Sequence, residues 1–221
     1  MAKLDHLTLI ICSGILQMVA IIDYDIGNIF AVVNMLQRLG IPCKVVAQVD
    51  EVLQAERIIL PGNGSFDACM RNLRTSGLVP VLEQQVLQRG VPLLGICVGA
   101  QMLGYGSAEG AEPGLGWLDM SVERFPELPN LRVPHMGWNH VTAAQVDHPL
   151  TQGIAADSRF YFVHSYYMQP RHTEKVLLGA HYGIDFAAGV VRDNIAGVQF
   201  HPEKSHRFGK QLLNAFARWT P

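Results

Sequence analysis

Residues 92–103 carry the clearest signal of the fold and read Pro-Leu-Leu-Gly-Ile-Cys-Val-Gly-Ala-Gln-Met-Leu. Residues 92–96 form an apolar run of strand length, and Gly95-Ile96-Cys97-Val98-Gly99 has the form of a sharp turn from a strand into a helix. Such a turn forces strained backbone angles at its centre, and glycines on both sides avoid collisions with neighbouring segments. Because the strand is apolar on both faces, it predicts a parallel sheet covered by helices on both sides.

Similar apolar runs, with helical patterns between them, lie on the N-terminal side of this stretch. Residues 19–23, 43–46 and 57–60 are predicted strands, and residues 28–39 and 78–88 are predicted helices. After Gly106, short alternating segments at 121–125, 161–167 and 176–181 predict antiparallel strands and loops. Residues 195–200 are a predicted strand and residues 209–219 a closing helix. We therefore expect an α/β fold: a mostly parallel, doubly wound sheet flanked by helices, with added antiparallel strands in the C-terminal half.

Composition places the chain among ordinary globular proteins. It has 221 residues, 49% of them hydrophobic and 16% charged, which suits one domain with a full core. A formal net charge of -2 gives no positive field for nucleic acid or anionic lipid, so we expect neither nucleic acid nor a membrane as partner. The four cysteines are too scattered for a disulfide framework or a zinc pair, and the histidines show no tight metal spacing. We expect no metal, no cofactor and a cytoplasmic location.

The N-terminus allows two interpretations. Lys3 precedes an apolar run at residues 7–16, about the length of a signal-peptide core. No small-residue cleavage site follows, however, and Met18 directly precedes the β-branched stretch that suits a first strand. We expect Met18 to be the natural start and residues 1–17 to be an extension, with residues 18–221 as the functional domain.

Three residues suggest nucleophilic catalysis. Cys97 occupies the centre of the sharp turn, where hydrolases carry a serine nucleophile. The predicted strand at 195–200 runs into His201-Pro202-Glu203, and residues two apart in an extended segment point to the same side. His201 can then serve as a base whose ring is oriented by the Glu203 carboxylate. Taken singly, Cys97 is more often a small core residue and His201 more often a structural histidine, and only their combination favours catalysis.

Several motifs together resemble a known family. They are Ile22-Asp23-Tyr24 with Gly27-Asn28, Pro61-Gly62-Asn63-Gly64-Ser65-Phe66, residues 95–101, Pro134-His135-Met136-Gly137-Trp138-Asn139, residues 161–167 and residues 197–205. Over residues 19–220 the sequence resembles the class I, triad-type glutamine amidotransferases. Within that class it is similar to the glutaminase subunits of imidazole glycerol phosphate synthase, for which the block at 134–139 is taken to be diagnostic.

The resemblance implies a set of roles for individual residues. Cys97 would be the nucleophile, His201 the general base and acid, and Glu203 the residue that orients it. Backbone amides around Gly62, Asn63 and Val98 would form the oxyanion hole. The residues implied to hold glutamine are Gly64, Gln101, Glu109, His164 and Ser165. For Glu109, a solvated loop charge is an equally open interpretation on sequence grounds.

The resemblance also implies a partner. Ammonia released from glutamine would pass, within a heterodimer, to a (βα)8-barrel cyclase that makes imidazole glycerol phosphate and AICAR in histidine biosynthesis. Asn28, Trp138, Tyr161 and Lys204 would lie at or near the interface with it. Without the family, Trp138 and Tyr161 are ordinary core aromatics and Lys204 a solvated charge.

Two departures from the family pattern keep alternatives open. Asn63 stands where a small apolar residue is usual, and since asparagine tolerates left-handed backbone angles, we hypothesise an altered basal glutaminase rate. His206 and Phe208 resemble a paralogous branch thought to supply ammonia for amidation of a surface-polysaccharide sugar. A catalytically inert regulatory or binding module and a cysteine peptidase of the same fold remain the other interpretations.

Overall fold

The structure of the protein is a computed structural model that describes residues 17–129 and 131–221. The predicted extension 1–17 therefore lies, apart from Gln17, outside the described residues. The largest sheet in the described part has ten strands. Its parallel half, in spatial order, consists of β2 (Cys43–Val46), β1 (Val19–Ile22), β3 (Arg57–Gly62), β4 (Leu93–Cys97) and β12 (Ile195–Val198).

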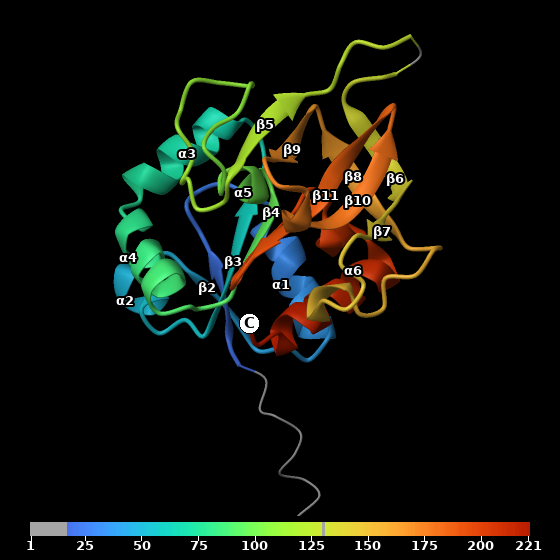
Figure 1. Cartoon of the computed structure of the whole chain (residues 1–221). Helices are drawn as coiled ribbons and strands as arrows, with labels where there is room; N and C mark the ends of the chain where they lie inside the picture. Colours follow the sequence, from blue (N-terminus) through green and yellow to red (C-terminus); the bar gives the residue numbers. More distant parts are fainter. Residues whose placement is uncertain (1–16, 130) are drawn as a thin grey trace, which may run out of the picture.

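Antiparallel strands extend this sheet beyond β12. They are β11 (Ile184–Arg192), β10 (Val176–Tyr182) and β7 (Thr142–Ala143), with β9 (Tyr166–Pro170) and β5 (Met120–Arg124) branching from β11. A separate two-stranded sheet pairs β6 (His135–His140) with β8 (Arg159–His164). Figure 1 shows β6, β7, β8 and β10 gathered on the side opposite α2, α3 and α4, with β5 nearer the middle. The predicted fold, a mostly parallel sheet with antiparallel additions in the C-terminal half, is confirmed.

Helices cover both faces of the parallel half. They are α1 (Ile29–Arg38), α2 (Val49–Val52), α3 (Phe66–Thr75), α4 (Val79–Glu83), α5 (Val98–Gln101) and α6 (His206–Arg218). The chain moves from β1 outward to β2 and then back past β1 to β3, and because such crossovers are right-handed, α1 lies on the opposite face from α2 to α4. Accordingly α1 packs on α6, and α2 packs on α4. The reversal lies between β1 and β3, so a crevice is expected at the carboxyl ends of these two strands, beside the end of β4.

Two predicted segments have wrong boundaries, and one predicted helix changes its type along its length. The segment 161–167 is not one strand, because the chain bends at Ser165 and passes from β8 into β9 of the other sheet. The predicted helix 78–88 is α4 followed by a π-helical turn Gln84–Gln88, in which the amide of Arg89 bonds to the carbonyl of Gln84. The closing helix begins at His206 rather than Gly209. A Cβ at Gly209 would lie 1.8 Å from the carbonyl oxygen of Pro202, so this glycine permits close packing inside the helix and does not begin it.

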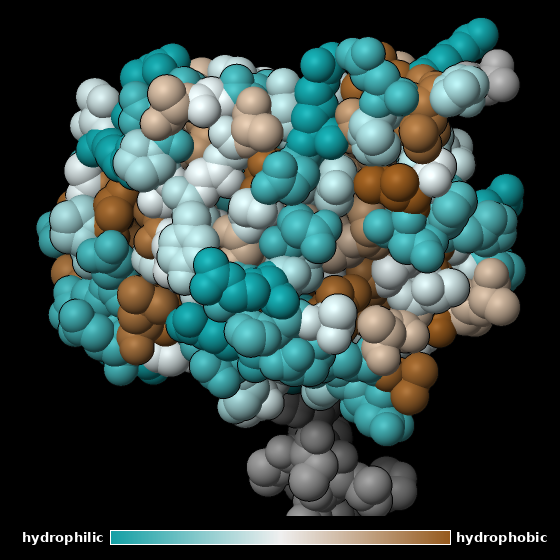
Figure 2. All heavy atoms as spheres, turned by 45° about the horizontal axis from the view of Figure 1, so that its top comes forward, coloured by the Kyte–Doolittle hydropathy of each residue, from teal (hydrophilic) through white to brown (hydrophobic). Residues whose placement is uncertain are grey.

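Short 3-10 turns connect some of these elements. They are Pro149–Thr151, Thr173–Lys175 and Pro202–Lys204. In the described part of the chain no helix is both long enough and apolar enough to cross a membrane. On the face that Figure 2 shows, apolar side chains form small separate groups among polar ones.

A glycine-to-alanine change tests how tightly the sheet packs on the turn after β4. A Cβ at Gly99 would lie 2.0 Å from the carbonyl oxygen of Leu60, a backbone atom that cannot move aside. We expect Gly99→Ala to lower the free energy of unfolding by about 3 kcal/mol or more, as seen for severe overpacking. Gly179→Ala is the matched control, because a Cβ there would meet only Thr142 Oγ1 at an ordinary 3.6 Å. Urea unfolding that gives equal losses for both variants would contradict this packing.

Candidate active site

The nucleophile candidate lies on a strained turn. Cys97 ends β4 with φ 55° and ψ -115°, a conformation that non-glycine residues rarely adopt. Gly62 at the end of β3 pairs in register with Cys97, and a Cβ on Gly62 would lie 2.1 Å from the amide nitrogen of Gly99. The predicted sharp turn is thus present, and glycine is required where β3 crosses it. The helix that follows, α5, has four residues.

His201 and Glu203 form a buried pair beside this turn. Nδ1 of His201 lies 2.8 Å from Glu203 Oε1, and the two side chains are 5% and 2% exposed. Since a carboxylate can only accept, Nδ1 carries the proton and Nε2 is the nitrogen left for other chemistry. The predicted contact between residues two apart is therefore observed, although it occurs where the strand has ended and Pro202–Lys204 forms a 3-10 turn.

Electrostatics favour a charged His201. Burial lowers the pKa of this imidazole, but the neighbouring Cys97 and the Glu203 carboxylate favour the imidazolium and raise the pKa to about 9. Nε2 itself is buried and has no hydrogen-bond partner of normal geometry within the described structure, and its interaction with the Cys97 side chain is one cause of the raised pKa. Such an arrangement places a buried imidazolium beside the Cys97 side chain.

A cavity of about 260 Å³ opens at Cys97. Eight of the residues proposed from the sequence line it: Asn63, Gly64, Cys97, Val98, Gln101, Glu109, His164 and Ser165. Gly62, His201 and Glu203 do not line the cavity and are buried beside it. Pro134, Val163 and Tyr166 also line it, and no sequence pattern predicted a role there for any of them. The structure thus gathers in one cavity residues that are far apart in the sequence.

The amide of Gln101 has a fixed orientation in this cavity. Its nitrogen lies 3.1 Å from the carbonyl oxygen of Tyr166 and 3.0 Å from Oε1 of Gln199. A backbone carbonyl can only accept, so the NH2 group faces Tyr166 and both of its hydrogens are committed. The side-chain oxygen of Gln101 is what remains to accept a hydrogen bond from a ligand. Gln199 in turn points its own amide nitrogen at Cys97 Sγ, at a long 3.9 Å.

The strand end at residues 61–64 is held from behind by two side chains. The hydroxyl of Tyr24 donates to the carbonyl of Pro61 at 2.6 Å, and the buried thiol of Cys69 donates to the carbonyl of Asn63 at 3.4 Å. Burial raises the pKa of both groups, so each keeps its proton at neutral pH and acts as a donor. Asn63 does not have a positive φ; Gly64, with φ 93°, takes the left-handed position instead. No sequence pattern predicted this function for Tyr24 or Cys69.

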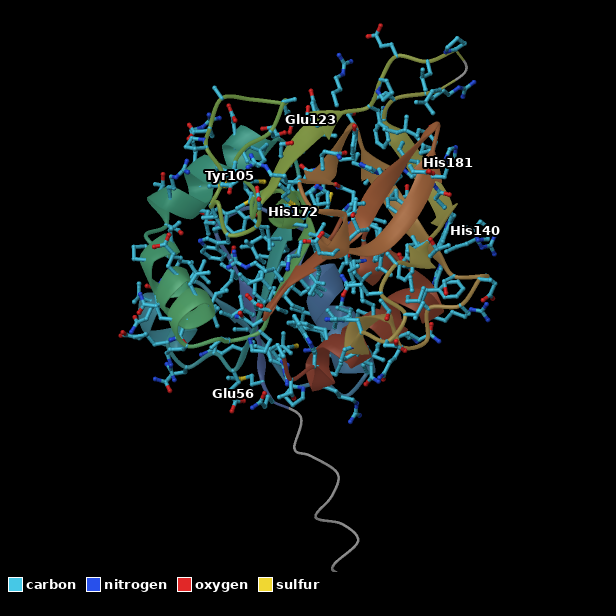
Figure 3. The ribbon with its side chains drawn as sticks, viewed as in Figure 1. Glu56, Tyr105, Glu123, His140, His172 and His181 are labelled. Carbon is cyan, nitrogen blue, oxygen red and sulfur yellow. The ribbon has the colours of Figure 1, made fainter. Side chains whose placement is uncertain are left out.

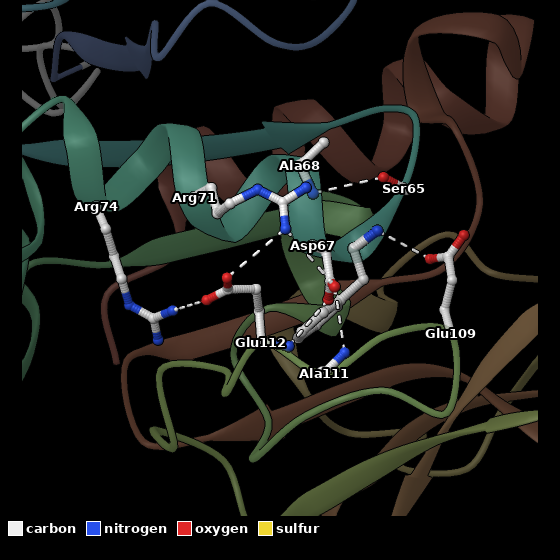
Figure 4. Close-up of polar contacts among 9 residues, drawn as sticks. Ser65, Asp67, Ala68, Arg71, Arg74, Glu109, Ala111 and Glu112 are labelled. Carbon is white, nitrogen blue, oxygen red and sulfur yellow. Dashed lines mark hydrogen bonds and ion pairs between the residues drawn. The ribbon is translucent and has the colours of Figure 1, made fainter.

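Glu109 is exposed but not a free loop charge. Its Oε2 accepts a hydrogen bond of 2.8 Å from the amide of Phe66, the first residue of α3 (Figure 4). Asp67 accepts from the amides of residues 111 and 112, and these bonds hold the pKa of Asp67 below its ordinary value. Arg74 and Glu112 add an ion pair of 2.9 Å. The loop that carries Glu109 is therefore fastened to α3 at the rim of the cavity.

Three of the four residues proposed for a partner interface lie together on the surface. The Trp138 and Tyr161 rings meet edge-on at 6.1 Å between centroids, and Lys204 Nζ lies 5.8 Å from the centre of the Tyr161 ring. Trp138 is 45% exposed, so the alternative of a core aromatic is wrong for it. His206 stacks on Trp138 at 5.4 Å, with the two rings nearly parallel. Asn28, exposed at the start of α1, makes no recorded contact with this group.

The other histidines of the described residues are not grouped as metal ligands. His140 on β6 and His181 on β10 (Figure 3) line a second groove of about 580 Å³, and His181 is paired with Asp185 at 2.7 Å. Across residues 17–129 and 131–221, no group of three or more histidine, cysteine, aspartate or glutamate side chains could hold a metal ion.

Comparison with known proteins identifies the family. The family model described as "Glutamine amidotransferase class-I" matches residues 20–218. The chain belongs to the class-I glutamine amidotransferases. This amidotransferase is 54% identical over 199 residues to imidazole glycerol phosphate synthase subunit HisH 2 of Pseudomonas aeruginosa, covering 90% of this chain and 98% of that one. It is 46% identical to subunit HisH of Bdellovibrio bacteriovorus, covering 90% and 99% of the two chains.

Solved structures of the amidotransferase fold agree with this placement. The crystal structure of a glutamine amidotransferase superposes with a TM-score of 0.67 at 23% identity, covering 90% of this chain and 96% of that one. PurLQS from Thermotoga maritima gives a TM-score of 0.67 at 18% identity, covering 91% and 98%. At such identities the likeness concerns the fold alone.

Proposed function

We propose that this amidotransferase hydrolyses glutamine to glutamate and ammonia, with Cys97 as nucleophile, His201 as proton carrier and Glu203 as the residue that orients His201. The observation that carries the proposal is the placement of Cys97 on a strained turn, beside a buried His201–Glu203 pair and at a cavity of about 260 Å³. Nucleophile, base and orienting carboxylate in this order are the parts that acyl transfer requires.

The proposed reaction has two stages. Cys97 Sγ attacks the carboxamide carbon of glutamine, and the C–N bond of the tetrahedral intermediate breaks as His201 gives its proton to the departing ammonia. Water, deprotonated by His201, then attacks the thioester carbon and releases glutamate with the return of Cys97. Backbone amides near Gly62, Asn63 and Val98 would stabilise the oxyanion, and each such donor is typically worth about 3 kcal/mol.

We propose that substrate glutamine is held by Gly64, Gln101, Glu109, His164 and Ser165. Of these, Gln101 has the clearest chemistry, because only its oxygen is uncommitted and it can accept from an ammonium or amide group of the substrate. Glu109 and the backbone at His164 and Ser165 line the same cavity. No part of this set depends on a metal or cofactor.

For the ammonia we propose delivery to a (βα)8-barrel cyclase that forms imidazole glycerol phosphate and AICAR in histidine biosynthesis. Relatives at 54% and 46% identity carry the name of a subunit of imidazole glycerol phosphate synthase. The exposed group of Trp138, Tyr161 and Lys204, with Asn28 on α1, would meet the cyclase in a heterodimer. The free cysteines Cys43, Cys69 and Cys97 suit a reducing cytoplasm. We further propose that residues 18–221 are the amidotransferase domain, supported by the family match to 20–218.

The direct test measures glutamate formation by the purified chain, alone and with the histidine-pathway cyclase of the same genome and its ribonucleotide ligand. Strong stimulation by the cyclase is expected. A chain that forms no glutamate in either state, and whose Cys97 resists a glutamine-like electrophile in the complex, would instead be an inert regulatory module.

Removing the Trp138 side chain should weaken binding of the cyclase. Exposed tryptophans at interfaces are frequent hot spots, so we expect Trp138→Ala to raise the dissociation constant at least about thirtyfold. Val146→Ala is the matched control, because Val146 is 70% exposed and lies outside this group. Titration of fluorescently labelled cyclase gives both constants. Equal affinity for the wild type and Trp138→Ala would place the interface elsewhere.

A second destination for ammonia is the amidation of a surface-polysaccharide sugar, with identical chemistry at Cys97. The residue that suggests this destination is His206, which departs from the family pattern and stacks on Trp138 within the proposed interface. A histidine-pathway cyclase that neither binds nor stimulates the chain would favour this destination.

A further inference from the structure

Strand β6 presents two polar side chains to the interior. Residues alternate along it, so His135 is 3% exposed while Met136 and Trp138 are 62% and 45% exposed, and Asn139 is half-buried. Gly137 has φ 133°, which a side chain would strain. The antiparallel register places His135 directly opposite His164 of β8, a residue at the cavity. The inward residues of the Pro134–Asn139 block thus face the proposed glutamine site, and the outward ones face solvent.

The tautomer of His164 follows from its partner. Nδ1 of His164 lies 2.7 Å from the carbonyl oxygen of Tyr166, which can only accept, so Nδ1 carries the proton. Burial lowers the pKa of His164 to about 3, despite the hydrogen bond to Tyr166 that favours the charged form. The ring is therefore neutral, and its Nε2 is an acceptor.

The tautomer of His135 follows in turn. Its Nδ1 lies 3.0 Å from the accepting Nε2 of His164, so this nitrogen must be the donor. Burial lowers the pKa of His135 to about 4, which leaves its Nε2 as an acceptor. The amide nitrogen of Asn139 lies 3.3 Å from that Nε2 and 2.8 Å from the carbonyl oxygen of His181. Because the Asn139 oxygen accepts from the amide of His140, the orientation of this side chain is also fixed.

These contacts form one continuous row of hydrogen bonds that all point the same way. Asn139 donates to His135, His135 to His164, and His164 to the Tyr166 carbonyl, to which Gln101 also donates at 3.1 Å. Aromatic rings hold His135 in place, with Phe162 stacked at 4.8 Å and Tyr182 at 3.9 Å between centroids. The row ends at the carbonyl that orients the Gln101 amide.

We propose that His135 and Asn139 are positioning residues for the glutamine site, because their donors fix His164 and the Tyr166 carbonyl and thereby the oxygen that Gln101 offers to the substrate. This role rests on the proposed glutaminase function. Neither side chain reaches the cavity itself, since its lining includes His164, Tyr166 and Gln101 but not His135 or Asn139. Loss of the row should therefore weaken glutamine binding more than it slows the chemical step.

The first arm of the test reads the tautomers directly. Nitrogen-15 NMR of histidine-labelled full-length protein should show both His135 and His164 as neutral rings protonated at Nδ1 between about pH 6 and 8. The titratable groups that pack against His135 are His164 and Tyr182, and His164 also lies near His201. Asn139→Asp, whose oxygens only accept, should move a proton to Nε2 of His135. A wild-type ring protonated only at Nε2 at either position overturns the row.

The second arm reads kinetics. For His135→Phe we expect KM for glutamine to rise roughly tenfold, with kcat within about threefold of the wild type. This pattern is expected when a variant loses binding energy that the ground state and the transition state share equally. His135→Asn, which can place an NH2 near the position of Nδ1, should restore part of the loss. Met136→Leu on the outward face is the control. Equal KM values for the wild type and His135→Phe overturn the proposal.

The two measurements distinguish failure of the positioning role from failure of the glutaminase function on which it rests. A wild type with both rings protonated at Nδ1 that hydrolyses no glutamine contradicts the glutaminase function, and the positioning role falls with it. An active wild type with the other tautomer contradicts the row alone. If His135→Phe unfolds, Asn139→Ala at the half-buried end of the row supplies the same KM comparison.

Discussion

Cys97→Ala abolishes glutamine hydrolysis, with an expected fall in rate of at least about a thousandfold, because removal of a nucleophile leaves only binding and oxyanion stabilisation. The measurement is glutamate formation by the complex with its cyclase. The change removes one sulfur atom from a residue that is 4% exposed, so the fold should persist. Supplying ammonium salt to the Cys97→Ala complex should restore the cyclase reaction, because the acceptor site does not use Cys97.

The control for Cys97 is another cysteine of the same chain. Cys43→Ser changes a half-buried thiol on β2, which lies at the far edge of the sheet from β4. Its rate of glutamate formation should stay within about twofold of the wild type, as for changes away from a site. Retained hydrolysis in Cys97→Ala would assign the nucleophile to another residue and remove the proposed mechanism.

Glu203→Gln has the second largest expected effect, a fall in kcat/KM of about a hundredfold or more, because the neutral amide no longer fixes and charges the imidazole. Burial lowers the pKa of His201, and Cys97 and Glu203 raise it to about 9. In the proposed mechanism the imidazolium that protonates ammonia is thus present below that pH and lost above it. Removing the carboxylate lowers the pKa, so the alkaline limb of the pH–rate profile should move to lower pH.

The same shift predicts a stability change with a definite sign. The folded pKa of His201 is about 9 and its ordinary value 6.5, so the charged pair stabilises the fold fully below pH 6.5 and this contribution is lost as pH rises through 9. The melting temperatures of the wild type and Glu203→Gln should therefore differ more near pH 6.5 than near pH 9. Glu123→Gln on the exposed end of β5 is the control. If the alkaline limb of the pH–rate profile lies at the same pH in Glu203→Gln and in the wild type, the Glu203 carboxylate does not raise the pKa of His201.

Local patterns predicted the parallel half of the fold well. Residues 43–46 form β2 as expected, and the strand expected at 19–23 ends one residue earlier. These strands were predictable because a continuous apolar run bounded by glycine or proline is a signal within the local sequence. Helix α3 was not predicted, although the sequence at its start contains a helix signal. Ser65 accepts a hydrogen bond from the amide of Ala68 as an N-cap, and Phe66 and Met70 are spaced for one buried face. Strand β6 gave no strand signal, since His135 and Asn139 are polar residues facing inward.

The candidate site divides in the same way. Cys97, His201 and Glu203 were predictable because each belongs to a short motif with a chemical reason. Tyr24 and Cys69 were not, because their bonds to Pro61 and Asn63 join segments that only the folded chain brings together. The tautomers of His135 and His164 depend on the register of β6 against β8, which no local pattern fixes.

The contact between β8 and His201, the proposed proton carrier, has a practical consequence for redesign of the proposed partner surface. The backbone amide of His201 donates to the carbonyl of Tyr161 at 2.9 Å, and Ser205 Oγ bridges the amide of Tyr161 and the carbonyl of His201. The Tyr161 ring contacts Trp138 at the surface, whereas the Tyr161 carbonyl bonds to the amide of His201. A substitution at Tyr161 that shifts its backbone would therefore also shift His201, whereas a substitution at Trp138 or His206 changes a ring contact that does not include His201.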